Sequence, residues 1–246
     1  MRLATMTVKA VLFDLGGTLV SYYDVEQFEP VLRESLAACL DVLGRPALDD
    51  AARGELLREA LKLNEGRADE AVWPLQERLA RLFEVHPGDC AALARLCSAF
   101  LQPIFAMASP DRFAVPLLAE LGASGIRTAI VSNTPWGSPA EAWRAELATH
   151  GLLDRVDAVV FCVDVGWRKP HAAPFAQALE LLGVDASEAV FVGDDPHWDV
   201  IGARRAGLTP VLISRHPRLR DPSPHVLTVS ALEEIPALVD RLNKTE

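Results

Sequence analysis

The chain has 246 residues, of which half are hydrophobic and 24% are charged, and its formal net charge is -10. This length and apolar content suffice for one large domain or for a core with an inserted subdomain. The negative charge argues against nucleic acid as a partner, because nucleic-acid-binding proteins normally carry a basic face.

The sequence contains no sign of a membrane segment or of secretion. The first residues, MRLATMTVKAV, lack the long apolar region and cleavage site of a signal peptide. No apolar stretch approaches the roughly 20 residues that span a bilayer. The four cysteines lie in apolar surroundings, as thiols do in a reducing compartment. We therefore expect a soluble, cytoplasmic protein that has no membrane partner and is a monomer or a homodimer.

The first predicted element is a buried strand, followed by a long helical stretch. Residues 8–13 (VKAVLF) form a short apolar run that ends at Asp14 and a pair of glycines. No strand signal then appears before about residue 126. Four amphipathic segments fill the interval, at 25–44, 47–66, 68–85 and 87–108. They predict a four-helix subdomain over residues 21–110, inserted after the first strand.

The rest of the chain alternates between helices and strands. Helical patterns cover 111–125, 138–151, 171–183, 200–208 and 231–243, and strand patterns cover 127–132, 157–164, 188–194, 210–214 and 225–229. This alternation is typical of parallel βαβ units. The sequence therefore predicts an α/β core, made of residues 1–20 and 111–246, with a doubly wound (Rossmann-like) parallel sheet.

Polar clusters follow four of the predicted strands. They are Asp14, the pair Ser132–Asn133, the loop GWRKP (166–170) and the segment GDDPHWD (193–199). In a doubly wound sheet, ligands bind at the carboxyl ends of the strands. The four clusters are therefore expected to meet at one edge of the sheet.

In this order, the clusters resemble the motifs of the haloacid dehalogenase (HAD) superfamily of hydrolases that use an aspartate nucleophile. FDLGGTL (13–19) resembles the first motif and IVSNT (130–134) the second. GWRKPHAAPF (166–175) is similar to the third, which bears a lysine, and VGDDPHWDVIGARRAG (192–207) to the acidic fourth. The helical insertion is similar to the family's C1-type cap, so the resemblance covers essentially the whole chain.

The resemblance implies roles for the residues in the first three motifs. Asp14 would be the nucleophile that takes up the transferred group, and Lys169, one of only four lysines, would pair with it and neutralise phosphoryl charge. Ser132 is the third catalytic candidate, and Asn133 and Thr18 are candidates for substrate binding. Local turn bonding is the alternative for Ser132 and Asn133.

The fourth motif implies a Mg²⁺ site, because hard carboxylate and carbonyl oxygens suit this ion. Asp14 and Asp194 would be its side-chain ligands, and the backbone carbonyl of Gly16 would be a third ligand. Asp199 would orient Lys169 or a metal-bound water. Asp195 is either a further acid beside the ion or the N-cap of the next turn.

The first motif departs from the pattern of the family's phosphatases at Gly16. Those enzymes carry an aspartate there, which protonates the leaving alkoxide and later activates water. Loss of a general acid/base costs about 10²–10⁴ in rate. The favoured function is therefore Mg²⁺-dependent phosphoryl transfer or hydrolysis on a small phosphorylated metabolite, with slow turnover or a restricted range of substrates.

Three alternatives to phosphatase chemistry stay open. Dehalogenation needs no leaving-group acid, but the family's dehalogenases also lack the metal-binding acids. Phosphonate cleavage needs a lysine in the cap, where Lys62 is the only one and lies in an ordinary helical setting. The third alternative is a non-catalytic protein that binds a phosphorylated ligand. Arg33, Arg67 and Arg78 are the cap candidates for grasping a substrate anion.

Overall fold

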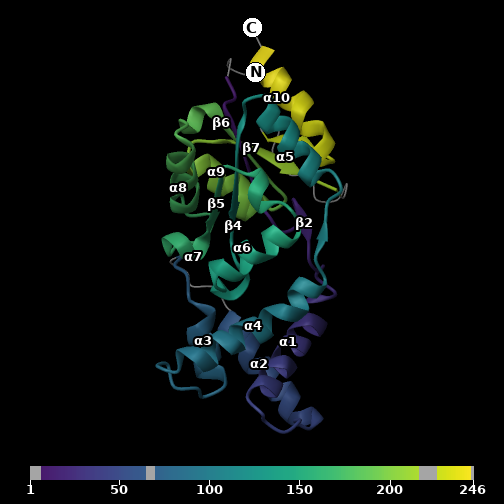
Figure 1. Cartoon of the computed structure of the whole chain (residues 1–246), viewed down its shortest axis with the longest axis vertical. Helices are drawn as coiled ribbons and strands as arrows, with labels where there is room; N and C mark the ends of the chain where they lie inside the picture. The colour runs from purple at the N-terminus through teal and green to yellow at the C-terminus, as the bar shows by residue number, and fades with distance from the viewer. Residues whose placement is uncertain (1–6, 65–69, 216–225, 245–246) are drawn as a thin grey trace.

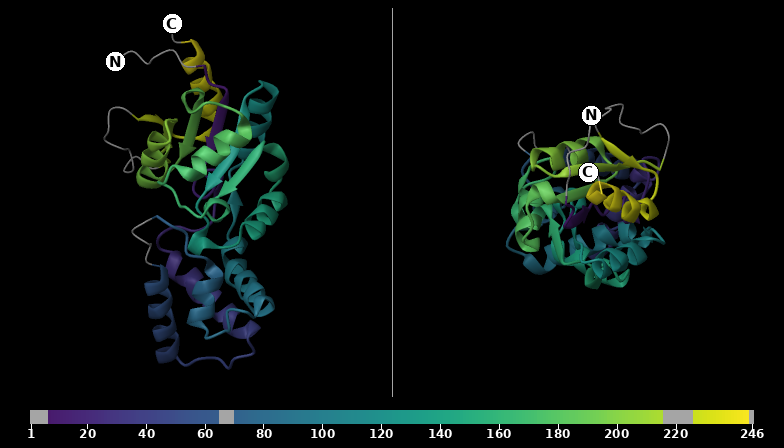
Figure 2. Two further views of the ribbon diagram at one scale, coloured as in Figure 1. Left: turned by 90° about the vertical axis from the view of Figure 1, so that its left-hand side faces the viewer. Right: turned by 90° about the horizontal axis from the view of Figure 1, so that it is seen from above.

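The computed structural model describes residues 7–64, 70–215 and 226–244. It has two lobes, an α/β core that carries the main sheet and a lobe of four helices below it (Figure 1). The side view in Figure 2 shows the same division, with the chain passing between the lobes at a narrow waist. Within the described residues, no helix is both long and apolar enough to cross a bilayer.

The core sheet has six parallel strands in the order β5-β4-β1-β6-β7-β8. Its strands are β1 (Ala10–Phe13), β4 (Arg127–Ser132), β5 (Ala158–Phe161), β6 (Ala189–Gly193), β7 (Thr209–Ile213) and β8 (Leu227–Val229). The chain starts in the centre, builds one side of the sheet and then crosses β1 to build the other. This order confirms the predicted doubly wound fold and puts the topological switch, where such sheets bind ligands, at the end of β1.

The central strand is apolar throughout because helices cover both of its faces. Ala10 and Leu12 pack in one hydrophobic cluster with α8 (Ala173–Leu182) and α9 (Gly202–Arg205). Val11 and Phe13 point the other way, into the cluster that contains α5 (Ala114–Ala123), α6 (Ala140–Thr149) and α10 (Ile235–Lys244). Figure 1 shows α8 and α9 on one side of the sheet and α5 and α10 on the other. This two-sided burial is the reason for the continuous apolar run.

The four predicted cap helices are present as α1 (Phe28–Val42), α2 (Asp50–Asn64), α3 (Leu75–Leu82) and α4 (Cys90–Ala106). Helix α1 packs against α4 and α2, and α3 packs between α2 and α4. The third helix is much shorter than the predicted 68–85. It begins only after Pro74, whose backbone is extended, because the residues before it pair with the core instead.

Two short strands join the lobes where the sequence indicated none. Strand β2 (Val20–Ser21) lies where the chain leaves the core, and β3 (Ser109–Pro110) lies where it returns. The two pair antiparallel, with Val20 opposite Pro110. Two residues are too few to show an alternating pattern, so the prediction that no strand precedes residue 126 was wrong here.

A third connection ties the cap to a core loop. The amide of Val72 donates to the carbonyl of Gly166 over 2.9 Å, and the amide of Arg168 donates to the carbonyl of Glu70 over 2.9 Å. The Glu70 carboxylate also pairs with Arg205 at 3.0 Å. The cap is therefore bonded directly to the loop that carries Lys169.

Three predicted elements have different bounds in the structure. The strand predicted at 157–164 ends at Phe161, because the one-turn helix α7 (Cys162–Val165) begins there and the Asp164 carboxylate accepts the Phe161 amide at 2.8 Å. The helix predicted at 200–208 begins earlier, with a wide turn, η4 (Pro196–Ile201), that continues into α9. Strand β8 covers part of 225–229, of which residue 225 lies outside the described residues.

Candidate active site

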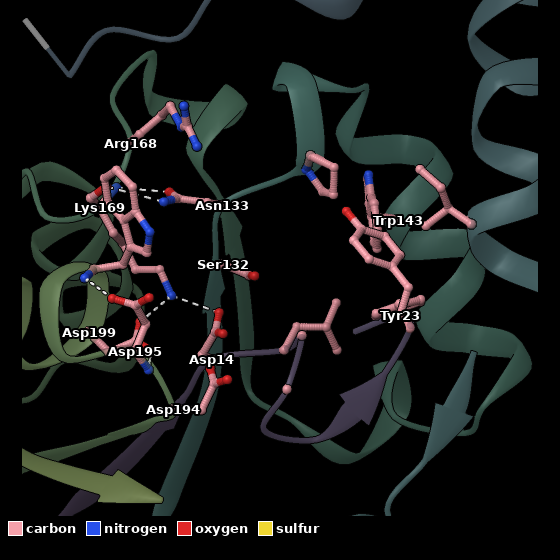
Figure 3. A pocket seen from close by; sticks show the side chains of 17 residues that line it. Asp14, Tyr23, Ser132, Asn133, Trp143, Arg168, Lys169, Asp194, Asp195 and Asp199 are labelled. Carbon is pink, nitrogen blue, oxygen red and sulfur yellow. Dashed lines mark hydrogen bonds and ion pairs between the residues drawn. The ribbon is translucent and has the colours of Figure 1, made fainter. Parts of the chain in front are cut away.

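A cleft of about 330 Å³ lies at the carboxyl ends of β1, β4 and β6, beside the cap. Residues from all four predicted polar clusters line it, among them Asp14, Ser132, Lys169 and Asp194. Figure 3 shows Asp14, Asp194, Asp199 and Lys169 on one side of the cleft, with Tyr23 and Trp143 across from them. The expectation that the clusters meet at one edge of the sheet is therefore met.

The centre of the site is a buried lysine between two carboxylates. The Nζ atom of Lys169 lies 2.7 Å from an oxygen of Asp14 and 2.7 Å from an oxygen of Asp199, and it also donates to the carbonyl of Val131 at 3.1 Å. Lys169 and Asp199 are each 2% exposed, and Asp14 is 8% exposed. The three contacts use all three donors of the ammonium group.

The charges of this cluster shift one another's pKa values. Burial alone would lower the pKa of Lys169, but the Asp14 and Asp199 carboxylates outweigh burial and raise it, so the lysine stays charged. Loss of contact with water, together with the charge of Asp14, raises the pKa of Asp199 in spite of its bond to Lys169. Desolvation and the two neighbouring carboxylates also raise the pKa of Asp194.

Replacement of Lys169 by methionine is expected to destabilise the metal-free protein by about 3–5 kcal/mol, because it leaves buried carboxylates without their cation. Thermal unfolding in EDTA at pH 8 measures the loss. Lys9→Met is the matched control: Lys9 pairs with Glu188 at 2.7 Å, but its side chain is 55% exposed, so we expect no measurable change. Equal effects of the two substitutions would contradict the importance of the buried pair.

Asn133 holds the lysine loop in place. Its side-chain oxygen accepts the amide of Lys169 at 2.8 Å, and its side-chain nitrogen donates to the carbonyl of Lys169 at 3.1 Å. This reciprocal pair joins the end of β4 to the loop after α7. Asn133 lines the cleft as predicted for a substrate-binding residue, but most of its bonding capacity is used to position Lys169.

The two predicted hydroxyl residues lie in different places. Ser132 is 6% exposed and lines the cleft, and Figure 3 shows its hydroxyl pointing into the cavity beside Asp14. Thr18 is completely buried, does not line the cleft, and its hydroxyl has no hydrogen-bond partner among the described residues. The geometry thus gives Ser132 access to a substrate and gives Thr18 none.

Three carboxylates come close enough to share a cation. Oxygens of Asp14, Asp194 and Asp199 lie within 4.8 Å of one another. Both oxygens of Asp199 are already bonded, one to Lys169 and the other to the amide of Asp195 at 3.0 Å. Asp194 is exposed, and one oxygen of Asp14 makes no bond to described residues. Asp14 and Asp194 therefore have the free oxygens that a Mg²⁺ ion requires.

The carboxylate of Asp195 has a local role. One of its oxygens accepts the amides of His197 at 2.7 Å and Trp198 at 2.8 Å. These bonds cap the wide turn η4 at its amino end. Of the two sequence-based alternatives for Asp195, this geometry matches the N-cap.

The two glycines after Asp14 differ in what they require. Gly17 has φ +78°, and a Cβ atom there would overlap the carboxylate of Asp194, so this position needs glycine. Gly16 has no such constraint: a Cβ atom would meet only Tyr22 Cδ2, at 3.9 Å, which is an ordinary contact. The backbone at position 16 therefore has room for the Cβ atom of a side chain. The loop's bonds, Gly17 amide to Val20 carbonyl and Val20 amide to Leu15 carbonyl, do not use the Gly16 carbonyl.

Aromatic side chains from the core and the cap connection form the opposite wall. Tyr22, Tyr23 and Trp143 line the cleft, and Tyr22 packs edge-on against Trp143 with ring centroids 5.4 Å apart. Burial and the nearby charges of Glu146 and Asp14 raise the pKa of Tyr22, so its phenol stays neutral. These rings give this side of the cleft an aromatic surface.

The two cap arginines that the structure describes, Arg33 and Arg78, do not line the cleft. Arg33 is on the outside of α1, paired with Glu29 at 2.8 Å. Arg78 is 2% exposed and donates to backbone carbonyls within the cap. Arg67 lies outside the described residues.

Two other arginines at the site were missed, although one stands inside a quoted motif. Arg168 directly precedes Lys169 and lines the cleft. Arg215 donates to the carbonyls of Gly17 and Thr18 and to the Asp111 carboxylate at 2.9 Å, which fixes the loop after β1. Its position next to Lys169 could have identified Arg168 as a site residue. No feature of the sequence around Arg215 sets this arginine apart from the others.

The chain is similar to known proteins over most of its length. The family model of haloacid dehalogenase-like hydrolases matches residues 8–207. A phosphoglycolate phosphatase of Rhodospirillum rubrum is 34% identical over 235 residues, which are 95% of this chain and 90% of that protein.

Two solved structures are similar in fold. A HAD phosphatase from Thermococcus onnurineus has a TM-score of 0.68 at 27% identity, covering 94% of this chain and 98% of its own. A 2-haloacid dehalogenase from Pseudomonas syringae also has a TM-score of 0.68, at 21% identity, covering 96% and 99%. The fold alone therefore does not distinguish a phosphatase from a dehalogenase. The residues that line the cleft are the remaining basis for that distinction.

Proposed function

Because this chain belongs to the family of haloacid dehalogenase-like hydrolases, we propose that it is a phosphatase or phosphotransferase that acts on small phosphorylated metabolites in the cytoplasm. The observation that carries the proposal is the buried Asp14–Lys169–Asp199 cluster beside the exposed carboxylate of Asp194. The named phosphatase relative supports the same reaction class. The cleft volume of about 330 Å³ suits a small substrate.

Asp14 is the proposed nucleophile. Lys169 holds the Asp14 carboxylate in place through one of its oxygens at 2.7 Å; one of the two carboxylate oxygens attacks phosphorus, and the other would face a Mg²⁺ ion. The new bond joins the attacking oxygen to phosphorus while the bond from phosphorus to the ester oxygen breaks. Lys169 and the Ser132 hydroxyl stabilise the negative charge on the phosphoryl group. Water then hydrolyses the aspartyl-phosphate and frees Asp14, or another acceptor takes the phosphoryl group.

The first step favours particular leaving groups. The departing oxygen needs a proton when it is an alkoxide, and Gly16 has no side chain to donate one. Aryl and acyl phosphates need no such donor, because their leaving groups are weaker bases. We therefore propose that these esters, or substrates that supply their own proton, are turned over fastest.

The site's free oxygens fit a Mg²⁺ ion. Asp14, Asp194 and the backbone carbonyl of Gly16 would hold it, and such an ion supplies Lewis-acid polarisation of a phosphoryl oxygen. Asp199, with both oxygens engaged, orients Lys169. The cluster of acids also distinguishes this chemistry from dehalogenation, in which a halide leaves without the help of a metal.

Phosphonate cleavage finds no support in the position of Lys62. Its ammonium group pairs with Glu59 at 2.5 Å on the outside of α2, its side chain is 67% exposed, and it does not line the cleft. A Schiff base formed there could not reach a substrate bound at Asp14. The cleft offers no other lysine except Lys169.

A screen of phosphate esters and haloacids, with and without Mg²⁺, tests the proposed function. We expect Mg²⁺-dependent phosphate release, with aryl and acyl phosphates ahead of alkyl phosphates. Metal-independent halide release would replace the proposal with dehalogenation. Ligand binding without any phosphate release would favour a non-catalytic binding protein.

Asp194→Asn distinguishes the effect of Asp194 on Mg²⁺ binding from its effect on the stability of the metal-free protein. In EDTA at pH 8 the variant is expected to unfold at a higher temperature than the wild type, because a carboxyl whose pKa is raised in the folded state opposes folding once it ionises. Added Mg²⁺ should stabilise the wild type by about 2.7 kcal/mol at 100 times Kd and leave the variant unchanged. Equal stabilisation of both proteins by Mg²⁺ would exclude Asp194 as a ligand.

A further inference from the structure

Arg168 differs from the other cation in the cleft because its charge is unpaired. Among the described residues, Lys169 and Arg168 are the basic ones that line the cleft. The ammonium group of Lys169 uses all its hydrogen-bond donors, to Asp14, Asp199 and the carbonyl of Val131. The guanidinium of Arg168 makes no hydrogen bond or ion pair with the described part of the chain, and its Nε atom is buried without a partner. A buried charged donor that lacks a partner is costly.

The position of Arg168 is fixed from both sides. Its amide is bonded to the carbonyl of Glu70, and the next residue is held by the reciprocal bonds to Asn133. Its guanidinium lies over the ring of Trp198, 5.4 Å from the centroid. Stacking on an aromatic face leaves the N–H groups at the edge of the guanidinium free to bind oxygens. Arg168 is thus held in place while its donors stay available.

The surroundings of Arg168 favour an anion. In Figure 3, Arg168 lies beyond Lys169 and Asn133 as seen from Asp14, so it is at the other end of the cleft from the acidic cluster. The nearby carboxylate of Glu70 is paired with Arg205. Burial lowers the pKa of Arg78 to about 10, and the positive charge of Arg168 adds to this effect. A ligand that brought negative charge would balance the unpaired charge of Arg168.

We propose that Arg168 binds a second anionic group of the substrate, a carboxylate or a second phosphate, while the phosphoryl group to be transferred lies at Asp14. This inference rests on the proposed function and narrows it to small phosphate esters that carry another anion. A guanidinium binds two oxygens of either group side by side. Arg168 is a specificity-determining residue in this arrangement and does not take part in bond breaking.

A series of two-carbon phosphates tests the proposal: ethyl phosphate, 2-phosphoglycolate and ethylene glycol bisphosphate. They differ only in the group at the end away from the ester. Arg168→Gln is expected to raise KM about 10- to 100-fold for the substrates whose second anion Arg168 binds, since a hydrogen bond to a charged group is worth that much. Ethyl phosphate, which has no second anionic group, should show a much smaller rise in KM. If KM rises more for 2-phosphoglycolate, Arg168 binds a carboxylate; if it rises more for ethylene glycol bisphosphate, Arg168 binds a phosphate.

Two further variants control the experiment. Arg127→Gln removes an arginine at the other end of β4, where it pairs with Asp157 at 3.2 Å, and should leave KM for all three compounds unchanged. Arg168→Lys keeps the charge but not the paired donors, so its KM should fall between those of the wild type and Arg168→Gln. A structural role of Arg168 would instead lower activity on all three compounds alike.

Binding calorimetry decides the inference even without turnover. The dissociation constants of the three compounds are measured with Asp14→Asn and with Asp14→Asn/Arg168→Gln. We expect Arg168→Gln to weaken the binding of at least one compound that has two anionic groups by about 10- to 100-fold and to weaken that of ethyl phosphate much less. Equal affinities in both proteins, or an equal loss for all three compounds, overturn the assignment of Arg168. The proposed function fails separately, if no compound of the wider screen releases phosphate.

Discussion

Asp14→Asn is expected to lower phosphate release by at least about 10⁴-fold, the scale seen when a catalytic nucleophile is removed. Asparagine has the same shape as aspartate, but its amide cannot attack phosphorus. The side chain would still fill the space beside Lys169, which retains its bond to Asp199 at 2.7 Å. The loss should therefore arise in the chemical step and not in the fold.

Single-turnover kinetics measure that step directly. After an acid quench, the wild type should carry acid-stable, hydroxylamine-labile phosphate, and Asp14→Asn should carry none. Binding of the substrate to the variant should be preserved, because one negative charge near the phosphoryl group is gone. Asp240→Asn, a change on the exposed face of α10, is the matched control and should behave as the wild type. Phosphate release by Asp14→Asn within tenfold of the wild-type rate would remove Asp14 from the mechanism.

Gly16→Asp is expected to raise the hydrolysis of alkyl phosphates by about 10²–10⁴-fold, which is the usual contribution of a positioned general acid/base. The structure has room for the Cβ atom of the new side chain, whose nearest neighbour would be Tyr22 Cδ2 at 3.9 Å. The aspartate would protonate the leaving alkoxide in the first step and take a proton from water in the second. Aryl and acyl phosphates should gain much less in the first step.

The ratio of rates on ethyl phosphate and on an aryl phosphate is the informative measurement. It should rise in Gly16→Asp and stay constant in Gly16→Asn, which adds the same bulk without an ionisable group. Gly17→Asp tests the position next to it and should unfold or distort the site, because its Cβ would overlap Asp194. If Gly16→Asp leaves alkyl phosphate hydrolysis unchanged, the missing aspartate is not what limits this site.

The sequence predicted the core fold well because two-sided burial leaves a strong local signal. Strand β1 is apolar at every position from Ala10 to Phe13, since helices cover both faces of the sheet. Alternation of such runs with amphipathic helices determines a parallel sheet almost uniquely. Short elements had no such signal. The pairing of β2 with β3 depends on residues 88 to 90 positions apart that only the folded chain brings together.

The members of the candidate site were predictable for a related reason. Asp14, Ser132, Lys169 and Asp194 each stand at or just beyond the end of a strand or in the loop that follows one, and parallel strands bring such ends to one edge. Their proposed roles still await experiment. The type and order of these residues along the chain were enough to suggest aspartyl chemistry and the absence of a general acid at Gly16.

Only the tertiary structure decided how each polar group is used, because hydrogen bonds form between residues that are far apart in sequence. The carboxylate of Asp195 caps its own turn. The carboxylate of Asp199 is bonded to Lys169, and Thr18 does not line the cleft. The donors of Lys169 are all engaged while those of Arg168 remain unpaired. The sequence by itself predicted the core fold and most of the polar groups that line the cleft, since both follow from local patterns. Which of those groups remain free to meet a substrate depends on long-range contacts.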